Sequence, residues 1–441
     1  MSSHHTSLLA SLKRFLTPQV WKQAHKAEKR KKSAPRWGLH PLLMILLIMT
    51  WTNGDSEGER FATAGACYVA MHQHSKRPGE TLQGFQMALA RVPLSVLHAL
   101  FAGVRQVLLR LCQRYWKTGP FVVMACDASR LECPRSDELE KELETCGKDK
   151  TAPMLQIMAL VLLPTGLLWS WCVGAGVASE HDQLRQLLPT LPSSTLLVGD
   201  CFYQGYQLYS DIIQAKASFL VRLSGKASFY VDRERSQKRF KDGNVYYWPE
   251  KTAQDLNKPP LELRLIRVRD RKKKDVWLLT NELSSQRLSR QQAGEYYRWR
   301  WHIEETFRTY KRTQSSIKLR SRTEALAYRE AEVSLLALQL LLAGEMRTHG
   351  QGTEKVLLVG SARKSLLHLR GDITTMIGSK LGPRQQRRYQ AALATVRSGG
   401  PGRKVRRKWP RRKDHKPPKP PKLRVMPERL KRKLRQHLGS K

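Results

Sequence analysis

The chain has 441 residues, 41% of them hydrophobic, which is enough for a sizeable core in two or three domains and excludes a wholly disordered protein. Its 79 Lys and Arg residues outnumber 37 Asp and Glu residues, and the net charge of +42 predicts a polyanionic partner, with nucleic acid as the leading candidate. The seven cysteines form no Cys-x-x-Cys pair, which argues against a zinc site and a disulfide framework.

The first 118 residues are expected to be helical. Amphipathic spacing predicts a helix over Leu8–Lys29, shorter helices over Pro41–Trp51 and Thr81–Arg91, and another that begins near Pro93. This part is a candidate DNA-binding domain, but helical packing without DNA recognition would give the same pattern. The apolar run Pro41–Trp51 has 11 residues, too few to span a bilayer, and no secretory signal precedes it. We therefore expect a soluble protein of the bacterial cytoplasm, associated with the nucleoid.

A mixed α/β sheet is predicted after Gly119. The apolar run Phe121–Cys126 ends in Asp127, and a second apolar run, Thr195–Gly199, ends in Asp200; both are typical of buried strands. The remaining elements expected here are a hairpin of Met154–Leu163 and Gly166–Gly174, helices over Glu180–Leu191 and Tyr206–Lys216, and a strand over Ser218–Leu223. Three strands, a helix, a strand, a helix and a strand describe a five-stranded mixed sheet.

The second half of the chain alternates between β-rich and helical composition. Short strands are predicted over Ser228–Asp232, Asn244–Trp248, Leu261–Arg269 and Asp275–Thr280, and helices over Ser289–Arg312 and Glu324–Arg347. Residues 401–441 hold 18 Lys and Arg residues and two acids, which predicts a largely disordered tail with a helix at Glu428–His437. Such a tail would bind DNA without reading its sequence.

Four residues of the long helix form a stripe. Tyr297, Arg300, Glu304 and Lys311 fall within roughly 60° of arc along about 21 Å of an α-helix. A solvated charged face is the simpler interpretation of such a stripe. The stripe nevertheless lies at the edge of an apolar face, where a carboxylate is partly shielded and still reachable by DNA. The apolar face consists of Tyr296, Trp299, Ile303, Phe307 and Tyr310, and the open side carries Arg298, Arg308 and Arg312.

Three carboxylates are candidate metal ligands. Asp127 and Asp200 each follow a buried strand, at the end where α/β sheets commonly build active sites, and Glu304 lies on the helix. Taken alone, either aspartate is better explained as an ordinary turn residue at a strand end. Together the three would repel one another unless cations intervened, and oxygen ligands of this kind suit Mg²⁺ or Mn²⁺. Two ions about 3.5–4 Å apart would serve an in-line displacement at a phosphodiester.

The spacing Y-(2)-R-(3)-E-(6)-K of Tyr297, Arg300, Glu304 and Lys311 resembles the signature of DDE transposases of the insertion-sequence-four family. The resemblance covers roughly residues 120–345. It implies an RNase H-like core with a β-rich insertion between the second Asp and the Glu. It also implies that Asp127, Asp200 and Glu304 bind the metal ions and perform catalysis, while the other three residues contact DNA phosphates.

Other positions match or depart from the family pattern. Trp301 matches a common aromatic position and is a candidate for stacking on a base, and Phe202-Tyr203 after Asp200 is also similar to the family. Ala128 stands where Gly is frequent, and Cys201 stands where Arg is frequent. These two departures concern local backbone and phosphate contacts rather than the three carboxylates.

The resemblance implies a DNA transposase of an insertion sequence. We expect it to nick double-stranded DNA at terminal inverted repeats with Mg²⁺ or Mn²⁺, to join the ends to target DNA by cut-and-paste through hairpinned ends, and to act as a homodimer. A catalytically inactive DNA-binding regulator and another RNase H-like nuclease, such as a junction resolvase, remain alternatives. The expected parts are a helical N-terminal domain (1–118), the catalytic core (119–224 and 284–348), the insertion (225–283), a C-terminal helical region (349–398) and the basic, largely disordered tail (399–441).

Overall fold

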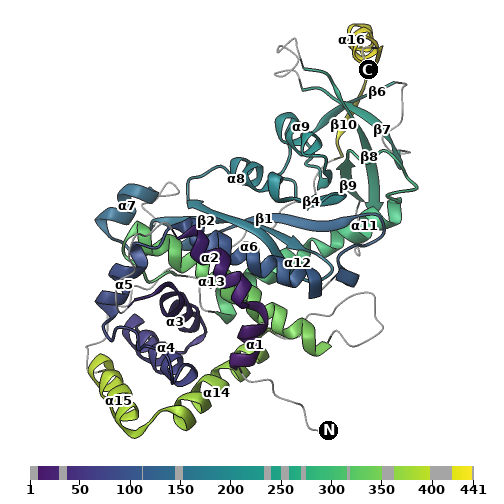
Figure 1. Ribbon diagram of the computed structural model, residues 1–441. Helices are drawn as coiled ribbons and strands as arrows, with labels where there is room; N and C mark the ends of the chain where they lie inside the picture. The colour runs from purple at the N-terminus through teal and green to yellow at the C-terminus, as the bar shows by residue number, and fades with distance from the viewer. Residues whose placement is uncertain are drawn as a thin grey trace.

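The computed structural model describes residues 8–28, 37–111, 113–144, 152–232, 240–249, 258–269, 275–314, 318–349, 362–397 and 420–439. Lys29, the predicted end of the first helix, and residues 399–419 of the predicted tail lie outside these ranges. Within them the protein combines one large sheet with a layer of helices from the first hundred residues (Figure 1).

Ten strands form the sheet. They are β1 (Val122–Glu132), β2 (Met154–Leu162), β3 (Leu167–Ala175), β4 (Thr195–Gly199), β5 (Ser218–Arg222), β6 (Ser228–Val231), β7 (Asp242–Tyr247), β8 (Leu261–Arg269), β9 (Asp275–Thr280) and β10 (Lys422–Val425). Their order is β10-β6-β7-β8-β9-β5-β4-β1-β2-β3. β1, β4 and β5 are parallel to one another, whereas β1, β2 and β3 pair antiparallel.

The sheet is wider than the sequence indicated. β9 pairs antiparallel with β5, so the predicted β-rich insertion continues the same sheet instead of forming a separate block. The expectation of a five-stranded sheet was therefore too narrow. The prediction for the tail was wrong in part, because β10 is a strand that pairs parallel with β6, whereas the helix predicted at Glu428–His437 is present over Glu428–Gly439. A left-handed glycine, Gly166 with φ of 69°, makes the turn of the β2–β3 hairpin, as the sequence predicted.

Helices cover both faces of the sheet. The N-terminal helices are α1 (Leu8–Phe15), α2 (Pro18–Ala27), α3 (Leu39–Trp51), α4 (Glu57–Met71), α5 (Leu82–Ala90) and α6 (Leu94–Leu111), followed by the 3₁₀ turn η1 (Gln113–Tyr115). The later helical elements are α7 (Asp137–Leu143), α8 (Glu180–Leu187), η2 (Leu188–Thr190), α9 (Tyr206–Gln214), α11 (Arg290–Trp299), α12 (Trp301–Arg308), the π-helical turn η3 (Thr309–Thr313), α13 (Glu324–His349), α14 (Ala362–Lys380), α15 (Pro383–Arg397) and α16 (Glu428–Gly439).

The N-terminal helices differ from the prediction in two places. The single helix expected from Leu8 is two helices, because Thr17 caps a new helix by accepting a hydrogen bond from the Val20 amide, and Pro18 suits its first turn. Helix α4 was not predicted, although Ser56 and Glu59 have the spacing of a helix-capping pair and Ser56 accepts from the Glu59 amide at 3.1 Å. Both differences come from capping side chains.

α13 holds the helical layer to the sheet. Its side chains are buried almost all round, and the amide of Gln339 pairs with both backbone groups of Leu168 in β3, at 2.8 and 2.9 Å. From the other side, the indole N–H of Trp51 donates to the Ala337 carbonyl at 3.3 Å. α6 is long and apolar enough to cross a membrane by length and composition, but its apolar face packs against the rest of this layer and against Trp171 of β3.

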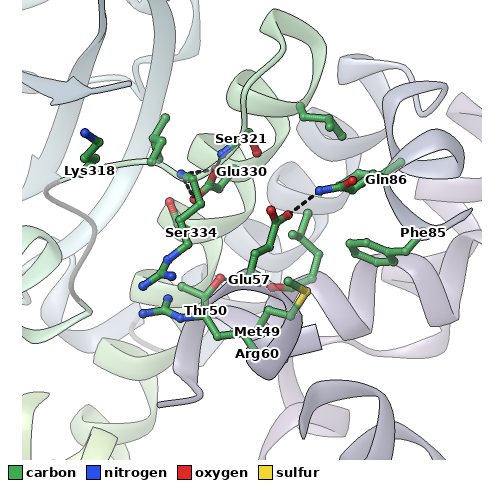
Figure 2. A pocket seen from close by; sticks show the side chains of 15 residues that line it. Met49, Thr50, Glu57, Arg60, Phe85, Gln86, Lys318, Ser321, Glu330 and Ser334 are labelled. Atoms are coloured by element: carbon green, nitrogen blue, oxygen red, sulfur yellow. Dashed lines mark hydrogen bonds between the residues drawn. The ribbon is translucent and has the colours of Figure 1, made fainter. Parts of the chain in front are cut away.

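A small cavity of about 50 Å³ lies at this junction (Figure 2). Glu330 of α13 accepts the backbone N–H groups of Arg320 and Ser321, at 3.0 and 2.8 Å, and so holds the segment that follows η3. Glu57 accepts from the Gln86 amide at 2.9 Å and ties α4 to α5. The described residues that line the cavity include none of the signature residues, so it belongs to the junction rather than to the candidate site.

Candidate active site

Three neighbouring parallel strands bring polar side chains to one level. Ala125 of β1 pairs with Val198 of β4, which in turn pairs with Leu220 of β5. Two residues further along each strand are Asp127, Asp200 and Arg222. Asp127 was expected to end its strand, and this was wrong, because β1 continues to Glu132 through its pairing with β2. Asp127 nevertheless lies just beyond the end of the β1–β4 pairing, next to Asp200.

The alternation of side chains places these three groups on one face. Ala125, Val198 and Leu220 all belong to the large core on the side of the helical layer. Because side chains two residues apart on a strand share a face, Asp127, Asp200 and Arg222 are directed to the same side. Tyr296, Ile303 and Phe307 of α11 and α12 pack into that same core. The stripe therefore lies over the face on which the aspartates stand.

The signature segment is an interrupted helix. α11 begins with a capping box, in which Ser289 Oγ accepts from the Gln292 amide at 3.2 Å and Gln292 Oε1 accepts from the Ser289 amide at 2.9 Å. A 3₁₀-type bond, from Arg300 N–H to the Tyr297 carbonyl at 3.2 Å, separates α11 from α12. The π turn η3 follows and contains Lys311. Such irregular turns inside helices are frequent at functional sites.

The expected faces of this helix are confirmed by burial. The four signature residues are half-buried, between a core-facing side and an exposed side. On the core-facing side Trp299 is half-buried and the other four residues are buried, while the three arginines on the open side are exposed. The sequence therefore placed the stripe correctly at the edge of the core.

Burial and a like charge disfavour ionisation of Asp127. The pKa of its carboxyl rises to about 7, mainly because of burial and further because of Asp200, while a hydrogen bond from the Ala128 amide at 2.9 Å opposes the rise. Asp200 accepts from the Phe202 amide at 2.7 Å. Arg300 also lies close enough to Asp127 to favour its ionised form. The two aspartates thus form an electrostatically coupled pair that a cation would stabilise.

Glu304 is turned toward Arg300. Arg300 Nη2 donates to Glu304 Oε1 at 2.7 Å, and the guanidinium lies 5.9 Å from the centre of the Tyr297 ring. The Nε atom of Arg300 is buried without a hydrogen-bond partner among the described residues. Arg300 is therefore close to both Asp127 and Glu304. Its Nε–H group remains available as a hydrogen-bond donor.

The remaining two signature residues, Tyr297 and Lys311, also interact with charged groups of the site. The Tyr297 hydroxyl forms a hydrogen bond with the Arg222 side chain, and burial raises the pKa of Tyr297 although Arg300 and Arg222 oppose this. Burial lowers the pKa of Lys311, and the nearby Asp127 opposes the decrease. Both residues thus share electrostatic contacts with the aspartates.

Trp301 lies at the exposed border of this arrangement. Its side chain is 49% exposed, although it is a large apolar group. Phe202, two residues after Asp200, is 57% exposed. An exposed aromatic side chain beside a catalytic candidate is available for stacking, which agrees with the expectation for Trp301 without testing it.

Comparison with known proteins places the chain in a family. The family described as "Transposase DDE domain" matches residues 118–340, which is half of the chain and spans all of the residues described above. The chain belongs to this transposase family. A search of curated proteins finds no match. Among solved structures, the chain is similar to one described as "Cryo-EM structure of piggyBac transposase synaptic complex with hairpin DNA (SNHP)", with a TM-score of 0.44 and 11% identity over 88% of this chain and 84% of that chain. A likeness at that level establishes nothing further.

Sequence reasoning missed several residues of the transposase domain that lie next to the aspartates. Arg222 ends a strand in the same way as Asp200, so the strand-end rule that found Asp200 would have found it too. Glu180, at the start of α8, also raises the pKa of Asp127 and accepts from the Tyr203 hydroxyl at 3.3 Å. No spacing in the sequence connects Glu180 with Asp127, because the fold alone brings α8 to this edge.

The donor set fits a divalent cation in part. Asp127 and Asp200 supply adjacent hard oxygen ligands whose mutual repulsion a cation would relieve. Among the residues described, however, no group of three His, Cys, Asp or Glu side chains is close enough to hold a metal ion. Glu304 would become the third ligand only if its ion pair with Arg300 were broken. The structure thus brings Asp127, Asp200, Arg300 and Lys311 together and holds the third carboxylate to one side.

Proposed function

We propose that this protein is a DNA transposase of the insertion-sequence-four type, with an RNase H-like core, that cuts the ends of its element and joins them to target DNA. The observation that carries the proposal is the placement of Asp127 and Asp200 at one level of the sheet, on the face covered by the signature helix. The order of β3, β2, β1, β4 and β5, with the last three parallel, agrees with an RNase H-like core.

Each signature residue has a role in this proposal. Asp127, Asp200 and Glu304 would hold Mg²⁺ or Mn²⁺, two ions in all, and the chemistry that these ions would supply is activation of the attacking oxygen and neutralisation of charge on the phosphodiester. Arg300 and Lys311 bind phosphate oxygens, and Tyr297 orients Arg300 while its hydroxyl is held by Arg222. The unpartnered Nε of Arg300 supports this role, since a phosphate oxygen would satisfy it.

Arg300 also controls the third carboxylate. Its Nη2 atom pairs with Glu304 Oε1 at 2.7 Å. A phosphate that engages Arg300 competes for this guanidinium and frees Glu304 to turn toward the aspartates. DNA binding and completion of the carboxylate set are therefore coupled in the proposed mechanism, because Glu304 joins the aspartates only when a phosphate occupies Arg300.

The wider proposal concerns partners and place of action. The substrates are the terminal inverted repeats and a target duplex, and cut-and-paste through hairpinned ends requires two ends to be held together, which a homodimer would do. The net charge of +42 supports DNA as the partner and a nucleoid-associated protein in the bacterial cytoplasm.

The test is metal-dependent nicking of DNA that carries the inverted repeats bracketing the gene. Asp127→Asn, Asp200→Asn and Glu304→Gln should reduce Mg²⁺-dependent nicking below detection while binding to the ends, measured by fluorescence anisotropy, persists. The matched control is Glu305→Gln, an exposed neighbour on the same helix, which should nick like the unaltered protein. Nicking at the unaltered rate by any of the three variants contradicts the assignment.

The same experiment separates the alternatives. An unaltered protein that binds the ends and never nicks them would be a transposase-derived DNA-binding regulator. Faster cleavage of four-way junctions than of terminal-repeat DNA would indicate a junction resolvase.

A further inference from the structure

The turn that follows β4 carries Asp200 and is held by several hydrogen bonds. Within the turn, the Phe202 amide donates to Asp200 Oδ1 at 2.7 Å, and the Tyr203 amide donates to the Asp200 carbonyl at 3.4 Å. The side-chain amide of Gln204 ties the end of the turn to β5, because it donates to the Arg222 carbonyl at 3.2 Å. The carboxylate of Asp200 therefore depends on the conformation of the residues that follow it.

Two consecutive residues of α8 hold the same turn. His181 Nε2 donates to the Phe202 carbonyl at 3.0 Å, and the two rings meet edge to face with their centres 5.5 Å apart. The Tyr203 hydroxyl donates to Glu180 Oε2 at 3.3 Å. Neither bond is made to Asp200 itself. α8 thus acts on Asp200 through the second and third residues after it.

Tyr203 anchors the turn in the core beneath α8. Its side chain is 1% exposed and packs in the second core of the sheet together with Leu184 and Leu187 of α8. Gly199, directly before Asp200, leaves room for the ring, since a Cβ at that position would lie 3.1 Å from it. Asp200 thus faces the signature helix while its turn is anchored on the opposite face of the sheet.

Glu180 supplies the strong acceptor for this buried hydroxyl. The sulfur of Met158, at 4.0 Å, is a weak alternative acceptor. A buried hydroxyl that loses its acceptor costs about 1–3 kcal/mol, so the Tyr203 ring has reason to move when Glu180 is removed. Movement of the ring would shift the turn and, with it, the carboxylate of Asp200.

We propose that Glu180 is a positioning residue of the cation site, which fixes Asp200 through the Tyr203 hydroxyl. Among the described residues no group of three His, Cys, Asp or Glu side chains is close enough to hold a metal ion, so Glu180 is assigned to orientation and not to coordination. Loss of a group that orients a metal ligand typically lowers metal affinity about 10- to 100-fold. This inference rests on the proposed function for the cation that it concerns.

The test measures the affinity of the full-length, DNA-free protein for Mn²⁺ by electron paramagnetic resonance. Glu180→Ala should weaken Mn²⁺ binding about tenfold. Tyr203→Phe removes the donor of the same hydrogen bond and should weaken binding to the same extent. Glu180→Gln keeps an acceptor for the hydroxyl and should stay within about threefold of the unaltered protein.

A double variant shows whether the two residues act as one unit. Glu180→Ala combined with Tyr203→Phe should bind Mn²⁺ no more weakly than either single variant, because both changes remove one and the same bond. The matched control is Gln186→Ala, an exposed residue later on α8 that takes no part in the bonds described, and its affinity should be unchanged. If Glu180→Ala fails to fold, the comparison of Tyr203→Phe with Glu180→Gln still tests the bond.

Three outcomes would overturn the inference. Glu180→Ala could bind Mn²⁺ as tightly as Gln186→Ala, or the losses in the double variant could add. Glu180→Gln could also bind as weakly as Glu180→Ala, which would assign the effect to the charge of Glu180 instead of its hydrogen bond.

Asp200→Asn separates these outcomes from a failure of the proposed function. Mn²⁺ binding that is absent from the unaltered protein, or that is unaffected by Asp200→Asn, contradicts the metal site and this inference with it. Binding that is lost in Asp200→Asn and retained in Glu180→Ala contradicts only the positioning role. Neither measurement requires DNA or catalysis.

Discussion

At the scale of single residues, ionisation of the Asp127 carboxyl is unfavourable in the folded protein. Its pKa of about 7, against an ordinary value of 3.8, means that folding favours its neutral form. At neutral pH and above, ionisation of this buried carboxyl, which also has Asp200 beside it, costs the folded state free energy that a bound cation would return. A cation-binding site is expected to behave in this way, because the bound cation stabilises the ionised carboxylates.

Asp127→Asn should therefore stabilise the metal-free protein in a pH-dependent manner. Because the folded-state pKa is raised, the unaltered protein keeps its full stability below about pH 4 and loses it progressively as pH rises toward 7. Asn keeps the acceptor for the Ala128 amide and avoids that loss, so its advantage should grow from near zero to about 2–4 kcal/mol above pH 7. Denaturant unfolding in EDTA at a series of pH values measures it.

Added Mg²⁺ provides the control for this prediction. It should stabilise the unaltered protein more than Asp127→Asn, because the variant lacks one of the carboxylates that bind the ion in the proposal. An advantage of the same size at about pH 5 and about pH 8 would show that ionisation of Asp127 is not its cause.

Residue-level reasoning from sequence identified the signature residues but not all of their partners. The pairing of Arg300 with Glu304 was accessible, because a cation and a carboxylate four residues apart on a helix are neighbours. The contact between Tyr297 and Arg222 was not, since it depends on how closely α11 packs against the end of β5. Sequence spacing gives neighbours within an element, and packing decides the rest.

At the scale of elements, the signature helix depends on how its first turn is held. Ser289→Ala and Gln292→Ala each remove one of the two capping-box hydrogen bonds. Each should reduce the free energy of unfolding by about 1 kcal/mol. The position of Tyr297 and Arg300, two turns later, should loosen with it, so DNA binding should weaken as well.

Urea unfolding of both single variants and the double variant tests this. Gln291→Ala is the matched control, since Gln291 is an exposed neighbour in the same turn and takes no part in the capping box. A loss of stability as large in Gln291→Ala as in Gln292→Ala would contradict the capping argument.

Strands were predictable where burial is continuous. The bounds of β4, β8 and β9 agree with the sequence, because β4 is buried throughout and the other two lie between charged turns. The predicted end of β1 was too early, because the second half of this strand is largely polar and extends beyond its pairing with β4. β10 is four residues in a Lys- and Pro-rich segment, and only its pairing with β6 makes it a strand.

At the scale of the whole molecule, a buried carboxylate joins the helical layer to the sheet. Glu332 of α13 is 4% exposed and accepts from the Trp171 indole of β3 at 2.5 Å and from His98 of α6 at 3.1 Å. Glu332→Ala leaves the indole N–H without an acceptor and opens a cavity, so it should cost about 3 kcal/mol.

Glu332→Gln separates charge from hydrogen bonding at this junction. It keeps an acceptor for Trp171 and should cost less than Glu332→Ala at neutral pH. The hydrogen bond with Glu332 raises the pKa of His98, so the stability that this ion pair contributes is present at low pH and is lost as pH rises through the His98 pKa. The penalty of the Gln variant should therefore be greater at about pH 5 than at about pH 8, and a pH-independent penalty would contradict this.

Removal of residues 420–441 should affect more than charge. Without β10, the edge of β6 is unpaired, and the apolar groups that Met426 and Leu430 cover become accessible. We expect a lower unfolding temperature and concentration-dependent aggregation, measured by light scattering. A variant with Arg429, Arg432 and Arg435 changed to Gln retains the strand and should remain monodisperse; aggregation of both proteins would assign the effect to charge.

The position of β10 in the chain sets an order of events during synthesis. It is the last strand of the described sheet to leave the ribosome, and it forms one edge of that sheet by pairing with β6. A chain that lacked β10 would still carry Asp127, Asp200 and Glu304, but the edge of β6 would be unpaired. Such an open edge would make the fragment a ready substrate for proteolysis.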